Sequence, residues 1–230
     1  YWRATKNTSI MKKILSLALL LVFSPAMYAQ KDVTKFLGIP VDGTKSEMIK
    51  KLKEKGFTES SNGDDILEGE FNGTDVYVSI VTDNNKVWRI GLADRNMTNE
   101  TNIRIRFNNL CQQFKNNKNY MPFSTDYTIP NDEKIGYEIL VNKKRYEANF
   151  YQCPDTTLLI QTIAQKYANK QSADSLTEEQ KEKILSDITS YVAKLTLKKS
   201  VWFIISEIYG QYYITMFYDN EYNHAQGEDL

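Results

Sequence analysis

Histidine and cysteine are scarce in this 230-residue chain, which has one histidine and two cysteines. A Ser-His-Asp or Cys-His arrangement would need His224, which lies in the polar C-terminal stretch. Scattered carboxylates offer no ligand spacing of the zinc or calcium type, and there is no Gly-rich phosphate loop. We therefore expect no catalytic residues, no metal and no cofactor, and we predict that the protein is not an enzyme.

Long apolar runs are lacking beyond residue 30, so we expect no transmembrane segment in the mature chain. Residues 11–29 are typical of a secretory signal peptide: Lys12 and Lys13 precede the apolar run Ile14–Phe23, and small residues lead to Ala29. We expect cleavage after Ala29 and a periplasmic or secreted protein, with residues 1–10 as a non-native upstream extension.

An excess of basic charge is absent as well. Loss of residues 1–29 removes four of the 29 Lys and Arg residues, which leaves 25 against 29 Asp and Glu. This mildly acidic balance argues against nucleic acid and against an anionic membrane surface as partners.

The first half of the mature chain, residues 30–97, is predicted to be a helix followed by a β meander. Thr44 and Glu47 form a capping box, apolar residues then recur at helical spacing, and Gly56 ends the helix. Asn72-Gly73 predicts a two-residue hairpin between strands 66–71 and 74–82. A further turn at residues 83–86 leads into the strand 87–93.

The register of this third strand follows from its apolar side chains. An odd loop places Trp88, Ile90 and Leu92 opposite Thr82, Ile80 and Val78, whereas an even loop turns the three away. We expect the odd loop, because it gives one continuous apolar face.

The second half, residues 98–218, repeats this order with an insertion. A helix begins at Thr98 or Asn99 and carries Ile103, Phe107, Leu110, Cys111 and Phe114 on one face. We then expect a short edge strand at residues 127–130 and a hairpin of strands 135–141 and 145–152.

The helical insertion spans residues 155–199. Residues 156–169 form a helix or, as an alternative, a strand, residues 170–175 form a loop, and Thr177–Gln180 caps a long helix. A last hairpin of strands 201–208 and 211–218 turns at Tyr209-Gly210. Both of its faces are apolar or aromatic, which predicts a central place in a sheet. Residues 219–230 are predicted to be a frayed polar tail.

These patterns predict an α+β fold of antiparallel β meanders with helices packed on one side, built as two helix-plus-sheet halves. The stretch Gly43–Phe57, with the meander that follows, resembles the repeat unit of the β-lactamase-inhibitor-protein-like and outer-membrane-assembly-lipoprotein-like folds. Residues 36–43 and 217–230 are similar to a family of uncharacterised secreted proteins of anaerobic gut bacteria. The first resemblance implies protein–protein contact.

The function expected from these observations is a non-catalytic module that binds a protein or another extracytoplasmic macromolecule through an exposed sheet face. Tyr209, Tyr212 and Tyr218 are the candidate binding residues, because aromatic rings with a polar tip suit interfaces. The alternative for these tyrosines is a partly buried place in the core.

A paired-carboxylate hydrolase acting on an extracytoplasmic polymer is the alternative function, because its two acids can come from any part of a fold. Glu68, Glu70 and Glu138 are predicted on strand faces opposite the core and would line its groove. Solvated positions on an antiparallel sheet explain the same three residues.

Cys111 and Cys153 are the two cysteines of a chain that we expect to reach an oxidising compartment. An even count there favours a disulfide. The alternative is two buried free thiols that pack as small apolar side chains.

Overall fold

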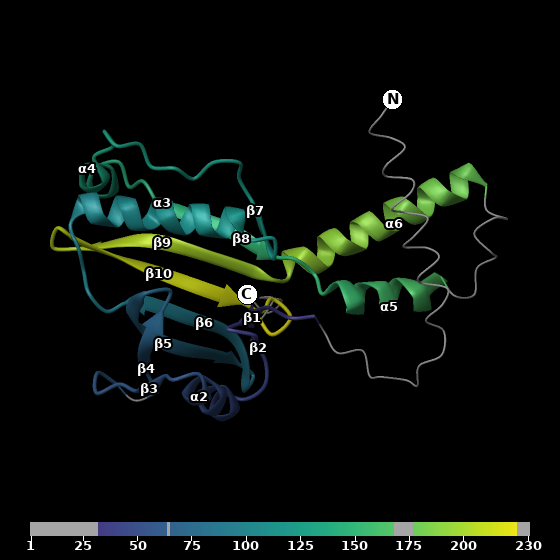
Figure 1. The fold of residues 1–230 in the computed structure, drawn as a ribbon, viewed down its shortest axis with the longest axis horizontal. Helices are drawn as coiled ribbons and strands as arrows, with labels where there is room; N and C mark the ends of the chain where they lie inside the picture. The colour runs from purple at the N-terminus through teal and green to yellow at the C-terminus, as the bar shows by residue number, and fades with distance from the viewer. Residues whose placement is uncertain (1–31, 64, 168–176, 225–230) are drawn as a thin grey trace. The chain divides into compact units, whose positions relative to one another are not determined.

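The structure is a computed structural model that describes residues 32–63, 65–167 and 177–224. The expectations for residues 1–29 and for the 170–175 loop lie outside the described residues. The chain divides into two compact units, one that includes residues 154–196 and one formed by residues 33–153 and 197–230. Figure 1 shows the chain path and labels the helices and strands of each unit.

The second unit contains an eight-stranded antiparallel sheet in the order β3-β4-β5-β6-β10-β9-β8-β7 and a two-stranded sheet of β1 and β2. Its strands are β1 (Lys35–Phe36), β2 (Ile39–Pro40), β3 (Thr58–Glu59), β4 (Leu67–Phe71), β5 (Thr74–Asp83), β6 (Lys86–Asp94), β7 (Tyr120–Pro122), β8 (Glu147–Gln152), β9 (Ser200–Ile208) and β10 (Gln211–Asp219). Its helices are α2 (Lys45–Glu54), α3 (Glu100–Asn116) and α4 (Ile135–Leu140). The α+β prediction is confirmed, and the two predicted halves join into one sheet where β6 pairs with β10.

Helix α2 begins at the predicted capping box. The Thr44 side chain accepts from the Glu47 amide, and the Glu47 carboxylate accepts from the Thr44 amide at 3.0 Å. The pKa of Glu47 is lowered mainly because its carboxylate accepts this backbone hydrogen bond. Met48 and Leu52 are fully buried against the sheet, which supplies the stability that so short a helix lacks alone.

The two predicted turns of the first meander have the backbone that their residues favour. Asn72 and Gly73 both have positive φ, as do Asn84 and Asn85 in the next turn. Ile90 lies opposite Ile80, and Leu92 opposite Val78, so the predicted register is confirmed there.

The predicted odd loop would have one extra residue in the turn. In the structure the turn is a two-residue loop, and the extra residue lies in β6 at a β-bulge beside Val81 and Thr82. The bulge changes which neighbour faces inward: Val87 is fully buried, whereas Trp88 is half-buried. The expected place of Trp88 opposite Thr82 is therefore wrong, because Thr82 pairs with Val87 and a bulge adds one residue to one strand.

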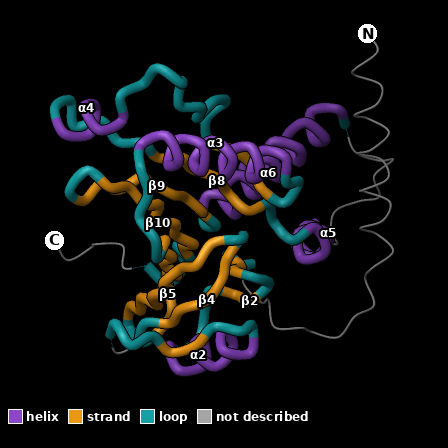
Figure 2. The backbone as a smooth tube through the Cα atoms, turned by 60° about the vertical axis from the view of Figure 1, so that its left-hand side comes forward, coloured by secondary structure: helices purple, strands orange, loops and turns teal. Residues whose placement is uncertain are grey.

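Figure 2 shows the backbone of α2 near β4 and β5 and that of α3 near β8 and β9. Buried side chains of both helices belong to one core with the inward-facing side chains of the sheet, so the two helices pack on the same face. Asn99 caps α3 by accepting from the Asn102 amide. Phe107 and Phe114 of α3 contact Phe203 of β9, with ring centroids 5.2 and 5.7 Å apart.

The prediction of a strand at residues 135–141 is wrong, because helix α4 forms there. The Glu100 carboxylate accepts from the amides of Ile135 and Gly136 at 2.8 and 3.3 Å, and so binds the exposed N–H groups at the start of the helix. Strand β8 pairs instead with β9 and β7. The prediction of an edge strand at residues 127–130 is also wrong. The strand at this edge of the sheet is β7, beside β8.

Strands β9 and β10 lie in the middle of the sheet, as the two apolar faces of their sequences predict. Their turn is Tyr209-Gly210, with φ of 51° and 76°. After β10 the chain does not fray at once, because Asn220 is fully buried and donates to the Val41 carbonyl at 2.6 Å. Asn223 donates to the Asp42 carboxylate and to the Val87 carbonyl. The prediction of a frayed tail is therefore wrong for residues 219–223, and residues 225–230 lie outside the described part.

The other unit contains helices α5 (Thr156–Tyr167) and α6 (Glu178–Leu197). The Asp155 carboxylate accepts from the Thr157 and Leu158 amides, which caps α5 and explains why this stretch is a helix. The predicted cap of α6 is present, since Thr177 and Gln180 exchange hydrogen bonds. No helix in the described parts of the chain is long and apolar enough to cross a membrane.

Candidate functional site

The face of the large sheet opposite α2 and α3 carries a cluster of stacked planar side chains. Successive side chains of a strand alternate between faces, so the neighbours of the buried Ile90, Phe203 and Tyr218 point to this outer face. We define the outer aromatic face by its half-buried or exposed side chains on β5 to β10, namely Val81, Trp88, Arg89, Met121, Tyr151, Trp202 and Phe217.

The rings of this face stack on one another and on a guanidinium group. Trp202 stacks on Phe217 with ring centroids 4.3 Å apart and planes at 29°. The Arg89 guanidinium carbon lies 4.6 Å from the Phe217 centroid and 4.2 Å from the Trp88 centroid. The His224 ring also packs against Trp88, with ring centroids 4.3 Å apart. These ring–ring and cation–π contacts join side chains from β6, β9, β10 and the C-terminal segment.

Asp219 holds this stack in place. Its carboxylate accepts from Arg89 Nε at 2.6 Å and Nη2 at 2.8 Å, and from Trp202 Nε1 at 2.9 Å. The Asp219 side chain is only 3% exposed. The Thr34 hydroxyl donates to its backbone carbonyl, which links the stack to the start of the described chain. A buried carboxylate with three charge-assisted or indole donors fixes the orientation of both neighbours.

Gly91 lies between the Ser79 side chain and the Phe217 ring on this face. A Cβ atom at this position would lie 2.8 Å from Ser79 Oγ, which is too close, and 3.6 Å from the Phe217 ring, which is an ordinary contact. The absence of a side chain at Gly91 therefore accommodates Ser79 on the neighbouring strand.

The outer aromatic face becomes more exposed toward the β7 edge. Met121 is exposed, and Phe123, which follows β7, is 71% exposed and lies edge-on to Tyr151 at 6.3 Å. Val81 is exposed at the other end of the same row of side chains. Between β5 and β7 the row crosses five strand spacings, or about 24 Å along the sheet.

The predicted binding tyrosines do not share one surface. Tyr209 is 99% exposed at the tip of the β9–β10 hairpin, whereas Tyr212 and Tyr218 are 5% and 3% exposed. Burial raises the pKa of both buried tyrosines. Tyr212 and Tyr218 therefore belong to the core, because their strand positions face the helices and not the outer face.

The predicted carboxylates are not brought together as a pair. Glu68 on β4 faces Arg95, with 3.7 Å between charged atoms, and Glu70 lies on the same strand. Glu138 is on α4, where its carboxylate accepts from Asn142. The strand position predicted for Glu138 is therefore wrong. No group of three or more His, Cys, Asp or Glu side chains suited to a metal occurs in residues 32–63, 65–167 and 177–224.

Cys111 and Cys153 are both free thiols, so the structure does not contain the predicted disulfide. Burial on the apolar side of α3 raises the pKa of the Cys111 thiol to about 12. The Cys153 thiol lies 3.6 Å from the Lys118 carbonyl, and its own carbonyl accepts from Lys199. The two side chains are thus held by separate contacts.

Sequence reasoning missed Arg89 and Asp219 and placed Trp88 in the core. The aromatic residues on both faces of the last hairpin were the available signal, since they include Trp202 and Phe217. Comparison with known proteins finds no matching family model, no similar curated protein and no similar solved structure. The two resemblances drawn from the sequence stay predictions.

Proposed function

We propose that the protein is an exported, non-catalytic binding module that holds a partner protein against the outer aromatic face. The observation that supports this most is the group of half-buried and exposed aromatic and apolar side chains around Arg89 on the sheet face opposite the helices. Contiguous apolar surface of this kind marks interaction sites in monomeric proteins, and Trp, Tyr, Phe, Met and Arg are enriched at such sites.

The stacking favours a protein partner over a polysaccharide. A sugar ring binds by lying on an open aromatic face, but Trp88, Phe217 and Trp202 each already have a ring or a guanidinium group stacked against them. Ring edges and the exposed Met121 and Phe123 side chains remain for contact, and these suit the irregular apolar surface of a protein.

The rigidity of the stack also favours binding. Asp219 fixes Arg89 and Trp202 before any partner arrives, so less side-chain freedom is lost on association. The row from Val81 to Met121, about 24 Å long, is comparable with the width of a standard protein interface.

Site-specific photo-crosslinking in cells tests this proposal. A photoreactive residue at position 81 and another at position 121 are expected to capture the same partner protein. The same residue at position 209, which is more exposed, is the control and is expected to capture none of it. Capture of the partner from position 209 alone, or of no partner from positions 81 and 121, would reject the proposal.

Export is supported by the basic, apolar and small-residue regions of residues 11–29. N-terminal sequencing of the protein from the extracytoplasmic fraction is expected to begin at Gln30. Recovery of the uncleaved chain in the cytoplasm would contradict the export part of the proposal and leave the binding part to the crosslinking result.

A further inference from the structure

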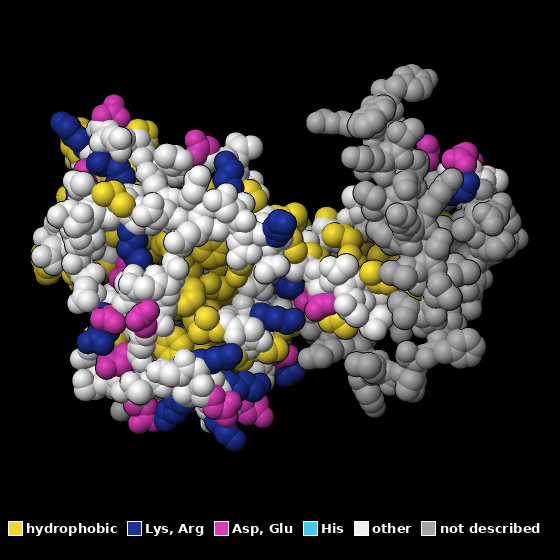
Figure 3. All heavy atoms as spheres, in the orientation of Figure 1, with side chains coloured by type: hydrophobic (Ala, Val, Ile, Leu, Met, Phe, Trp, Pro, Cys, Tyr) yellow, Lys and Arg dark blue, Asp and Glu magenta, His cyan; other side chains and the backbone are white. Residues whose placement is uncertain are grey.

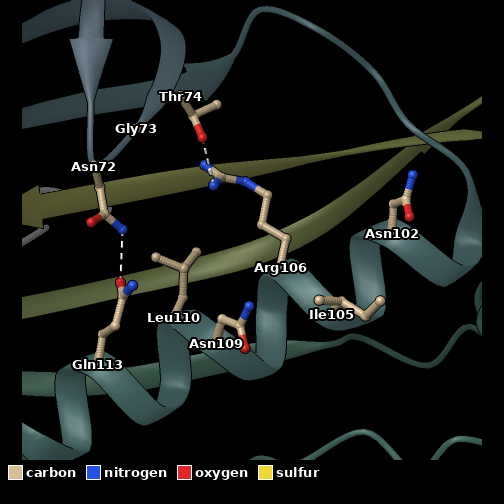
Figure 4. A pocket seen from close by; sticks show the side chains of 9 residues that line it. All are labelled: Asn72, Gly73, Thr74, Asn102, Ile105, Arg106, Asn109, Leu110 and Gln113. Carbon is tan, nitrogen blue, oxygen red and sulfur yellow. Dashed lines mark hydrogen bonds between the residues drawn. The ribbon is translucent and has the colours of Figure 1, made fainter.

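A cleft lies on the helix-bearing face of the large sheet, between α3 and the β4–β5 turn (Figure 4). We call it the α3 cleft. Its volume is about 410 Å³, within the range of about 300–1,000 Å³ that is usual for ligand sites. In the space-filling view, hydrophobic side chains gather in a hollow on the side of the molecule that faces the viewer (Figure 3). The cleft and the outer aromatic face are on opposite sides of the sheet.

Polar side chains of one kind surround the α3 cleft. Four carboxamides line it, from Asn72, Asn102, Asn109 and Gln113. Asn72 Nδ2 donates to Gln113 Oε1 at 2.7 Å, so this pair bridges the hairpin turn and the helix at one end. Figure 4 shows Asn102 and Asn109 farther along the same helix. Each carboxamide presents a donor and an acceptor side by side.

The α3 cleft has no free charge. Arg106 is the one ionisable residue among the nine that line it. Its guanidinium donates to both carboxylate oxygens of Asp94, at 2.8 and 2.6 Å, and to the Thr74 hydroxyl at 2.8 Å. The Asp94 side chain is 5% exposed, so the pair is fixed and neutral. This arrangement favours an uncharged ligand over a phosphate or a carboxylate.

The length of the cleft and the residues that line it favour an extended peptide over a sugar. Asn102 and Gln113 are separated by eleven residues of helix, or about 16 Å, which matches about five residues of extended chain. None of the nine lining residues is aromatic, so a sugar would find no ring to stack on. Ile105, which is 54% exposed, provides apolar surface between the amides, while Leu110 lies at the base of the cleft and belongs to the core.

We propose that the α3 cleft binds an extended, uncharged peptide segment of about five residues through its main-chain amide groups. Asn102 and Asn109 pair with main-chain N–H and C=O groups, and an apolar side chain of the ligand contacts Ile105. The proposal does not depend on the outer aromatic face.

Nuclear magnetic resonance of the full mature protein tests this inference. The probe is a set of acetylated and amidated pentapeptides of Val, Thr, Ser and Gln. Binding is expected to shift the side-chain amide signals of Asn102 and Asn109. The double substitution Asn102→Leu and Asn109→Leu is expected to weaken binding at least tenfold.

Gln112→Leu is the matched control, because Gln112 is exposed on α3 and does not line the cleft. It is expected to leave the affinity unchanged, as is Phe123→Ser on the outer face. Absence of amide shifts with every peptide would overturn the inference, and so would equal weakening by Gln112→Leu. Shifts with a neutral oligosaccharide but not with the peptides would also overturn it. Unchanged spectra elsewhere show that each variant is folded.

Discussion

Arg89 donates to the Asp219 carboxylate from both Nε and Nη2. The two residues are 130 positions apart in the chain, but they lie on the adjacent strands β6 and β10. The carboxylate is almost fully buried and the guanidinium mostly so. Removing one partner of such a pair leaves a poorly solvated charge, which costs more than the pair contributes when intact.

Asp219→Asn is therefore expected to lower the free energy of unfolding by about 2–3 kcal/mol. Urea unfolding followed by circular dichroism measures this change. Asp75→Asn, at an exposed position on β5, is the control and is expected to change stability by less than about 0.5 kcal/mol. Equal effects of the two substitutions would show that the Arg89–Asp219 pair is not a special contributor.

Buried tyrosines predict a loss of stability at high pH. Burial raises the pKa of Tyr212 and Tyr218 in the folded protein, while an unfolded tyrosine ionises near pH 10. The folded state then binds more protons than the unfolded chain, so stability is complete below about pH 10 and falls as the pH rises above it.

Tyr218→Phe is expected to reduce this alkaline loss, whereas Tyr209→Phe at the exposed hairpin tip leaves it unchanged. Unfolding midpoints measured between neutral pH and pH 11 compare the two variants. An alkaline loss that is the same in both would assign it to other groups.

The two thiols are expected to differ in reactivity. The raised pKa of Cys111 leaves little thiolate at pH 8, and the thiolate is the form that reacts. Unreduced protein is expected to give two thiols in denaturant, while Cys111 reacts slowly in the native state. The variant Cys153→Ser isolates the Cys111 signal in a titration with a chromogenic disulfide. Fewer than two thiols in denaturant would restore the disulfide prediction.

The β5–β6 turn offers a test in both directions at one residue. Asn85 has φ of 61°, a conformation that glycine adopts freely and that β-branched residues avoid. Asn85→Gly is expected to raise the free energy of unfolding by about 0.5 kcal/mol, and Asn85→Val to lower it by about 1–2 kcal/mol. Thermal unfolding measures both. A stabilising valine would show that the turn has a different backbone in solution.

Local signals were sufficient for the elements whose cause lies within a few residues. The capping box of Thr44 and Glu47, the Asn72-Gly73 hairpin and the cap at Thr177 all depend on contacts within four positions. The side-chain pattern of β5 and β6 also identified their register at the pairs Val78–Leu92 and Ile80–Ile90, because that pairing gives one continuous apolar face, but it failed beside the bulge at Val81 and Thr82.

Helix α4 and the stack on the outer aromatic face depend on contacts between residues far apart in the sequence. Helix α4 forms where a strand was predicted because Glu100, 35 positions earlier, binds its first amides. The stack of Trp88, Arg89 and Phe217 exists because β6 pairs with β10, and the bulge that turns Trp88 outward leaves no mark in residue type. Pairing between segments so far apart cannot be read from periodicity alone.

The pairing of β6 with β10 also dictates when the protein can fold during synthesis. Strands β4 to β6 are made early, but the strand that pairs with β6 is completed only at Asp219. Until then β6 is an edge strand with unpaired N–H and C=O groups, which can pair with a strand of another chain. A ribosome-bound chain of this protein therefore cannot close its sheet until β10 has been synthesised as far as Asp219 and has left the ribosome.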